Sequence, residues 1–112
     1  MLPRSKRLVA KRDFDVVYRR SGKLRSSGFT LAYLNTRSSL PTKIGIVVSK
    51  KVSPRAVKRN LYRRRIAACL IKLKKVIPVK GFKIVIVINS LIVNEKYQQI
   101  YNSLAIILTK IR

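Results

Sequence analysis

The chain has 112 residues, a length typical of one domain. Hydrophobic residues make up 47% of it, which is enough for a modest core and excludes a purely disordered basic tail. Its 27 lysines and arginines stand against three acidic residues, and the resulting formal net charge of +24 indicates a polyanionic partner, most simply a nucleic acid.

The sequence shows no sign of export or membrane insertion. Its one cysteine, Cys69, excludes an internal disulfide and fits a reducing compartment. Residues 1–12 are basic but lack the continuous apolar stretch of a signal peptide, and no run approaches the ~20 apolar residues of a transmembrane helix. We therefore expect a cytoplasmic protein that acts without a membrane.

Two elements are expected at the start of the chain. Residues 1–10 are predicted to form a basic N-terminal arm. A short helix is predicted over 11–20, because Phe14, Val17 and Tyr18 recur at helical spacing.

Strands are expected next. Gly22 is predicted to cap the end of the first helix, and a short edge strand over 23–26 is predicted beside a strand over 29–34. The segment 43–49 is nearly continuous in isoleucine and valine. This pattern is typical of a strand that is central in its sheet or buried on both faces.

A long basic helix is predicted over 54–75, with Ser53 as its N-cap and Pro54 in its first turn. Apolar residues at helical spacing give it one buried face, formed by Tyr62, Ile66, Cys69, Leu70, Leu73 and Ile77. The opposite face carries Asn60, Leu61, Arg64 and Ala68, with Arg63 and Arg65 beside them. These arginines are therefore expected to face water or a ligand.

A strand over 82–89 and a C-terminal helix complete the pattern. Asn94 and Glu95 are expected to begin this helix, as its N-cap and its first-turn acid. Its apolar stripe consists of Tyr97, Ile100, Tyr101, Leu104, Ile107, Leu108 and Ile111. The predicted order is α-β-β-β-α-β-α, a small α+β sandwich in a single domain, 1–112.

The side chains of an autonomous enzyme are missing from the sequence. There is no histidine, and Cys69 falls on an apolar helical stripe, where we expect a core residue. Asp13 and Asp15 are two positions apart on a helix and do not face each other, so no cluster of carboxylates is available for metal ions. There is also no glycine-rich phosphate loop. We expect no catalytic residue, no metal site and no small-molecule substrate.

The basic residues are densest between Lys58 and Arg65, where five of eight residues are lysine or arginine. The planar guanidinium of arginine suits phosphate, and such contacts give sequence-independent affinity for nucleic acids. Roughly half of the basic residues are equally well explained as a solvated face. Like charges packed as closely as these are costly without a polyanion, so this segment is predicted to bind nucleic acid.

Aromatic residues are expected where the first helix meets the sheet: Phe14, Tyr18, Phe29 and Tyr33. Aromatic faces beside basic groups hold single-stranded nucleic acid with little sequence preference. Each of these residues alone is equally well explained as ordinary core. Alternation puts Phe29 and Tyr33 on the same face of their strand, but spacing does not decide which face meets a ligand.

The sequence resembles the protein subunits of bacterial ribonuclease P over nearly its whole length. The similarity is specific at Ile44-Gly45-Ile46-Val47-Val48-Ser49-Lys50-Lys51 and at Ala56-Val57-Lys58-Arg59-Asn60-Leu61-Tyr62-Arg63-Arg64, which looks like the Arg-Asn-Arg signature helix of that family. The resemblance implies a left-handed βαβ crossover, which is rare among proteins. It also implies an endoribonuclease whose catalyst is an RNA subunit with Mg²⁺ at its centre.

The resemblance also implies the residues that bind each RNA. Contacts to the ribonuclease P RNA are implied for Lys50, Lys51, Lys58, Arg59, Asn60, Arg63, Arg64 and Arg65. The 5′ leader of precursor tRNA is implied to bind in a cleft between the first helix and the sheet, lined by Phe14, Tyr18 and Tyr33. The protein would then bind both RNAs and assist removal of the leader.

The chain departs from the family pattern at three places. Leu61 takes the third position of the signature, so one expected RNA contact is missing, for which 63–65 offer a replacement. At a position of the second strand where members of the family can carry an aromatic residue, this chain has Ala32. The neighbouring Tyr33 lies on the other face unless a bulge shifts it. The last strand ends at 89–90 without the basic residue that relatives often have.

Two other functions fit the composition. A structural RNA-binding protein of ribosomal type would have similar charge, and only the signature helix with its preceding strand favours ribonuclease P over it. A cationic membrane-active protein would need a basic helix with a large exposed apolar face. Here the apolar stripes are expected to be used for the core.

Overall fold

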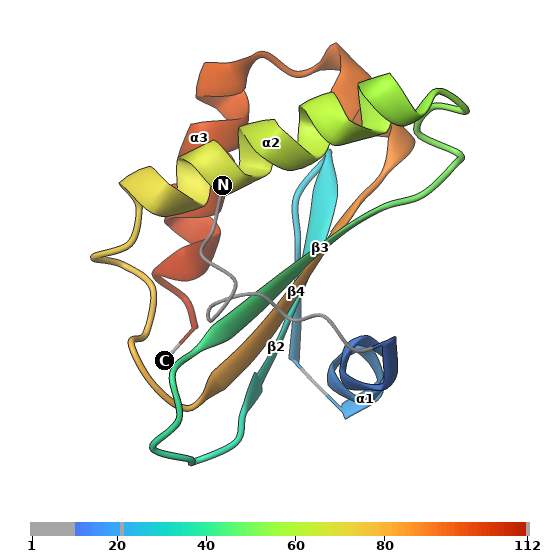
Figure 1. Ribbon diagram of the computed structural model, residues 1–112. Coiled ribbons are helices and arrows are strands. Elements are labelled where there is room, and N and C mark those ends of the chain that lie inside the picture. The colour runs from blue at the N-terminus through green and yellow to red at the C-terminus, as the bar shows by residue number, and fades with distance from the viewer. Residues whose placement is uncertain (1–10, 21, 112) are drawn as a thin grey trace.

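The computed structural model describes residues 11–20 and 22–111, which form four strands and three α-helices (Figure 1). The elements are α1 (Lys11–Arg20), β1 (Gly22–Arg25), β2 (Phe29–Asn35), β3 (Lys43–Val48), α2 (Ala56–Lys72), β4 (Phe82–Ile88), the 3-10 helix η2 (Ser90–Asn94) and α3 (Tyr97–Leu108). The predicted α+β class and the order α-β-β-β-α-β-α are confirmed. The predicted basic arm over 1–10 lies outside the described residues.

The four strands form one mixed sheet in the order β1-β2-β4-β3. β2 is antiparallel to β1 and to β4, whereas β3 is parallel to β4. A parallel pair needs a crossover connection, and α2 supplies it between β3 and β4. α2 and α3 cover one face of the sheet and α1 lies against the other face, which completes the predicted sandwich (Figure 1).

β3 is an edge strand of the described sheet, so of the two alternatives predicted for 43–49, a central strand or a strand buried on both faces, the structure agrees with the second. The central position belongs to β4, between β2 and β3. Both faces of β3 are nevertheless covered, because Ile44 and Val48 belong to the main core and Val47 packs against the smaller cluster under α1. An edge strand covered on both faces has the same apolar sequence as a central strand, which is why the sequence left both alternatives open.

Two hydrophobic cores hold the layers together. The larger core lies between the sheet and the pair α2 and α3, and fully buried side chains such as Ile86 and Leu104 form its centre. The smaller core consists of Val17 from α1 and Ala32 and Val85 from the sheet. Because so few buried side chains hold α1, much of its aromatic flank remains open to solvent.

The predicted buried stripes of the two long helices are confirmed except at Ile77, Tyr97 and Tyr101, which are only partly buried against the same core. The buried members of the α2 stripe are Tyr62, Ile66, Cys69 and Leu70, with Leu73 just beyond the helix, and those of the α3 stripe are Ile100, Leu104, Ile107 and Leu108, with Ile111 just beyond the helix. Burial raises the pKa of the Cys69 thiol. The thiol is therefore held in its protonated, unreactive form, as expected of a core residue.

α2 is shorter than predicted at both ends. It begins at Ala56 instead of residue 54 and ends at Lys72 instead of residue 75. Arg55 is its N-cap, with an extended backbone, and no side chain caps the helix. The Ser53 hydroxyl instead accepts a hydrogen bond of 3.2 Å from the amide of Arg55, which forms a turn before the helix.

Two other predicted caps are also wrong. Asn94 ends the 3-10 helix η2, and α3 begins at Tyr97, where the amide of Lys96 donates to the Gln99 side chain at 2.7 Å. Gly22 does not cap α1 but lies in β1. A Cβ atom at Gly22 would lie 2.8 Å from the Tyr33 ring, so the absence of a side chain permits this close approach.

Candidate nucleic-acid interface

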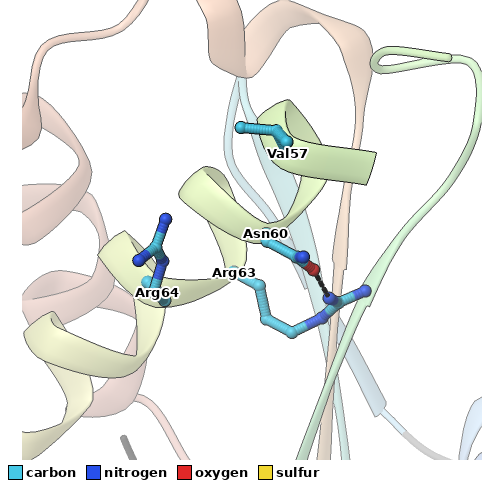
Figure 2. Close-up of a pocket in the computed structure, with 4 residues that line it drawn as sticks. All are labelled: Val57, Asn60, Arg63 and Arg64. Carbon is cyan, nitrogen blue, oxygen red and sulfur yellow. Dashed lines mark hydrogen bonds between the residues drawn. The ribbon is translucent and has the colours of Figure 1, made fainter. Parts of the chain in front are cut away.

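The exposed side of α2 carries a hollow of about 360 Å³, lined by Val57, Asn60, Arg63 and Arg64. Spacings of three, four and seven residues bring these side chains to one side of the helix. Figure 2 shows Arg63 bending toward Asn60, while Arg64 points away from this pair. Val57 is 74% exposed and adds an apolar surface to the lining of the hollow.

Asn60 orients the guanidinium of Arg63. Its Oδ1 accepts a hydrogen bond of 2.7 Å from Nη1 of Arg63 (Figure 2). This bond fixes one edge of the planar guanidinium, which has further N–H donors, and the Asn60 amide has two N–H donors of its own. The pair therefore presents preoriented donors of the kind that bind phosphate and sugar oxygens.

Arg59 braces the loop that precedes α2. Its Nη1 donates to the carbonyl oxygen of Ser53 at 2.9 Å and to that of Pro54 at 2.8 Å. These bonds hold the β3–α2 loop against the first turn of the helix. The remaining guanidinium nitrogens are still donors, so the predicted RNA contact of Arg59 would be made from this braced position.

The other predicted RNA-binding residues differ in their surroundings. Lys50 and Lys51 are exposed in the turn after β3, and Lys58 is exposed in the first turn of α2. Arg65 is half-buried and lies over the ring of Tyr62, with 5.6 Å between the guanidinium carbon and the ring centroid. This cation–π contact draws Arg65 to the flank of α2 and away from the hollow.

Leu61, the departure from the signature, does not line the hollow. Its side chain is half-buried, whereas Arg64 is exposed and lines the hollow three residues later. Arg64, in the next turn of the helix, thus supplies the positive charge that Leu61 does not.

No described carboxylate neutralises the arginines of α2. Glu95 is the only acidic side chain that the structure describes, and its Oε1 accepts a hydrogen bond from the hydroxyl of Ser27, in the β1–β2 hairpin. Cations that no carboxylate neutralises are free to bind phosphates, and such contacts release the counterions of a nucleic acid. This face of α2 is therefore electrostatically suited to a polyanion.

A second hollow, the α1 groove, lies between α1 and the sheet and has a volume of about 320 Å³. Its lining consists of Phe14, Tyr18 and Arg19 from α1 and Val47, Val85 and Val87 from β3 and β4. Phe14 and Tyr18 thus lie in a cleft at the predicted place. Arg19 and the three valines were not predicted as lining residues. The valines could not be, because only the strand register shows which residues of β3 and β4 face α1.

Lys23 adds a cation beside the groove. Its Nζ lies 4.6 Å from the centroid of the Tyr18 ring. Lys23 reaches α1 because β1 pairs with β2, where its partner Ala32 belongs to the cluster under α1. An aromatic ring with an ammonium group beside it is suited to single-stranded nucleic acid.

Tyr33 does not lie in the α1 groove, which corrects its predicted position beside Phe14 and Tyr18. β1, β2 and β4 pair in unbroken register, so no bulge turns Tyr33 toward α1. Its ring packs against the main core and next to Gly22 on the opposite face. Ala32 faces α1 instead and is fully buried.

Neither a metal-binding cluster nor a membrane-spanning helix occurs in the described part of the chain. Within residues 11–20 and 22–111, no three histidine, cysteine, aspartate or glutamate side chains come together. None of the helices in these ranges is long and apolar enough to cross a bilayer.

Residues 2–112 match the model of one protein family, described as ribonuclease P. The ribonuclease P protein component of a Pseudanabaena species is 36% identical over 110 residues, which cover 98% of this chain and 94% of that protein. The corresponding protein of a Picosynechococcus species is 40% identical over 89 residues, which cover 79% of this chain and 74% of that protein.

Solved structures of similar fold include the ribonuclease P proteins of Thermotoga maritima and Staphylococcus aureus. The first is 25% identical, with a TM-score of 0.83 and coverage of 95% of this chain and 97% of that chain. The second is 24% identical, also with a TM-score of 0.83, and the match covers 96% of this chain and 98% of that chain. Both agree with this structure in fold over nearly their full length.

Proposed function

Because the chain belongs to the bacterial ribonuclease P protein family, we propose that the exposed face of α2 binds the ribonuclease P RNA and that the α1 groove binds the 5′ leader of precursor tRNA. The chain is the protein subunit of ribonuclease P and acts in the processing of tRNA 5′ ends.

The hollow of α2 supports the assignment of this helix to the ribonuclease P RNA. Asn60 and Arg63 are already hydrogen-bonded to each other at 2.7 Å, and Arg64 stands beside them without a described carboxylate. Donors fixed before binding lose little entropy when they meet a phosphate. Contacts to phosphates position a protein on RNA without reading its sequence, which suits a subunit that binds a folded RNA of fixed shape.

The chemistry of the α1 groove supports the second assignment. A leader is single-stranded, and its bases can stack on aromatic rings while its phosphates meet cations. Tyr18 is 40% exposed, Lys23 lies over its ring, and the valines of β3 and β4 form an apolar floor. This combination tolerates many base sequences, as a subunit that processes different precursors requires.

Hydrolysis is assigned to the RNA subunit. The described residues supply neither a metal-binding cluster nor a histidine, and the Cys69 thiol is buried. Mg²⁺ bound by the RNA would supply the Lewis-acid chemistry of leader removal. The role of the protein is then to hold the leader beside the catalytic RNA, so that more binding energy is available to the precursor than to the mature tRNA.

The protein alone is expected to leave precursor tRNA uncleaved in magnesium buffer. The measurement uses protein purified under denaturing conditions, refolded and freed of RNA, with gel analysis of the precursor. The same preparation should support cleavage once ribonuclease P RNA is added, which controls for misfolding. Cleavage at the leader junction by the RNA-free protein would overturn the assignment of catalysis to the RNA.

A further inference from the structure

Three cations of α2 form a row along the flank of the helix that borders α3, called here the flank row: Lys58, Arg65 and Lys72. They are seven residues apart, so they follow one another along the helix at intervals of about 10.5 Å with a drift of only about 20° per interval. Arg65 comes one residue after Arg64 and therefore lies about 100° around the helix from it. The flank row is thus a separate surface from the hollow of α2.

Aromatic rings position two of the three cations. The guanidinium carbon of Arg65 lies 5.6 Å from the centroid of the Tyr62 ring, and Nζ of Lys72 lies 5.3 Å from the centroid of the Tyr97 ring. Tyr62 is buried and Tyr97 is half-buried against the main core, so core packing fixes both rings. Attraction to a ring face leaves the N–H donors of a cation available. Both cations are therefore held at the surface before any ligand binds.

No described carboxylate neutralises the flank row. Glu95, the only acidic side chain that the structure describes, accepts its hydrogen bond from Ser27 in the β1–β2 hairpin. Lys58 and Lys72 are exposed, and Arg65 is half-buried. The three charges extend over about 21 Å of helix, which suits a run of phosphates better than a single small anion.

An uncharged strip separates the flank row from the hollow. Leu61 and Ala68 lie about 60° and about 40° around the helix from Arg64, on the side toward Arg65. Both are half-buried and neither carries a charge. α2 therefore presents two cationic stripes with a strip between them that offers phosphates no cation. The departure from the signature at Leu61 keeps the two stripes apart.

We propose that the flank row binds a second stretch of the sugar–phosphate backbone of the ribonuclease P RNA, separate from the stretch at the hollow. This inference rests on the proposed function of α2. A helix is about 10–12 Å across with its side chains, so the two stretches would run along two sides of α2 and hold it between them. Contacts on two sides fix the rotation of the subunit about the axis of α2, and with it the direction in which the α1 groove meets the leader.

The first test removes two charges of the flank row by Lys58→Gln combined with Lys72→Gln. Both side chains are exposed, and Arg65 stays over its ring, so folding should be retained. Binding of the ribonuclease P RNA is expected to weaken about tenfold, and the slope of log K against log salt should fall by about 1.4–1.8.

The matched control is Lys80→Gln combined with Lys110→Gln, which removes two charges from exposed positions outside α2. It should lower the slope much less, because neither lysine belongs to a stripe of the helix. An equal fall in both double variants would overturn the inference, since the flank row would then contribute only bulk charge.

Hydroxyl-radical footprinting of the ribonuclease P RNA distinguishes the two stretches. The wild-type protein is expected to protect two groups of nucleotides from cleavage. The flank-row variant should lose one group, and Arg63→Ala with Arg64→Ala should lose the other. Loss of the same nucleotides in both variants would overturn the inference, and so would a flank-row variant with the wild-type footprint.

The two variants also separate this inference from the proposed function. If only the arginine variant loses affinity for the ribonuclease P RNA, the inference fails and the proposed function of α2 stands. If neither variant loses affinity, both fail. A flank-row variant that is impaired only in binding precursor tRNA would contradict the inference, because the row would then contact the substrate.

Discussion

Replacing both Arg63 and Arg64 by alanine is expected to weaken binding of the ribonuclease P RNA by about 100-fold, if each charged hydrogen-bonding group contributes roughly 1.5 kcal/mol. The slope of log K against log salt should fall by about 1.4–1.8, because each phosphate contact contributes about 0.7–0.9. Both side chains line the hollow of α2, and neither has a described carboxylate partner. Filter binding over a range of salt concentrations measures both quantities.

Two controls separate contact from bulk charge in this experiment. Lys96→Ala combined with Lys110→Ala removes two charges from exposed positions outside the hollow and should change the slope much less. Arg63→Lys with Arg64→Lys keeps the charge but loses the planar donors, so it should retain the slope and lose part of the affinity. A slope that stays at the wild-type value in the double alanine variant would remove both arginines from the interface.

Tyr18→Ala is expected to weaken binding of leader-bearing precursor tRNA and to leave binding of mature tRNA unchanged. Stacking of one base on an aromatic ring contributes about 1–3 kcal/mol, so the expected loss is about 5- to 150-fold. The ring of Tyr18 is 40% exposed in the α1 groove, and Lys23 holds an ammonium group over it. Binding of both tRNAs to the reconstituted holoenzyme gives the discrimination ratio.

The same helix provides the controls. Val16 is also 40% exposed on α1 but does not line the groove, so Val16→Ala should leave the discrimination ratio unchanged. Tyr18→Phe keeps the stacking surface and should retain most of the affinity. Equal losses for precursor and mature tRNA would show that Tyr18 does not distinguish the leader.

The elements of this fold follow from local patterns, and their spatial order does not. Apolar residues at spacings of three and four predicted the buried stripes of α2 and α3, because each helix buries one side against the same core. The strand order depends on pairing between distant segments. Nothing in the apolar run of 43–49 distinguishes an edge strand covered on both faces from a central strand.

The functional surfaces were likewise predictable where they depend on spacing within one helix, and not where they depend on strand pairing. Helical spacing brought Asn60, Arg63 and Arg64 to one face, and the structure has them around one hollow. Tyr33 could not be assigned, because its orientation depends on an unbroken register with β1 and β4.

The hydrogen bonds of Arg59 to its own backbone could not be predicted from the sequence. The signature helix suggests that its first arginine is simply an RNA contact, but Nη1 of Arg59 is bonded to two carbonyl groups of the preceding loop. A long side chain can reach either a ligand or its own backbone, and composition does not distinguish the two. Arg64, one turn later, is exposed and lines the hollow instead.

Cleavage of precursor tRNA by a bacterial ribonuclease P RNA at low magnesium tests the central claim most directly, namely that this protein holds the leader for a catalytic RNA. Adding the protein should accelerate removal of the 5′ leader well above the rate of the RNA alone, with the cleavage site unchanged. The acceleration should disappear when Arg63 and Arg64 are replaced by alanine. An unchanged rate with the wild-type protein, under conditions where the RNA alone is active at high magnesium, would contradict the account.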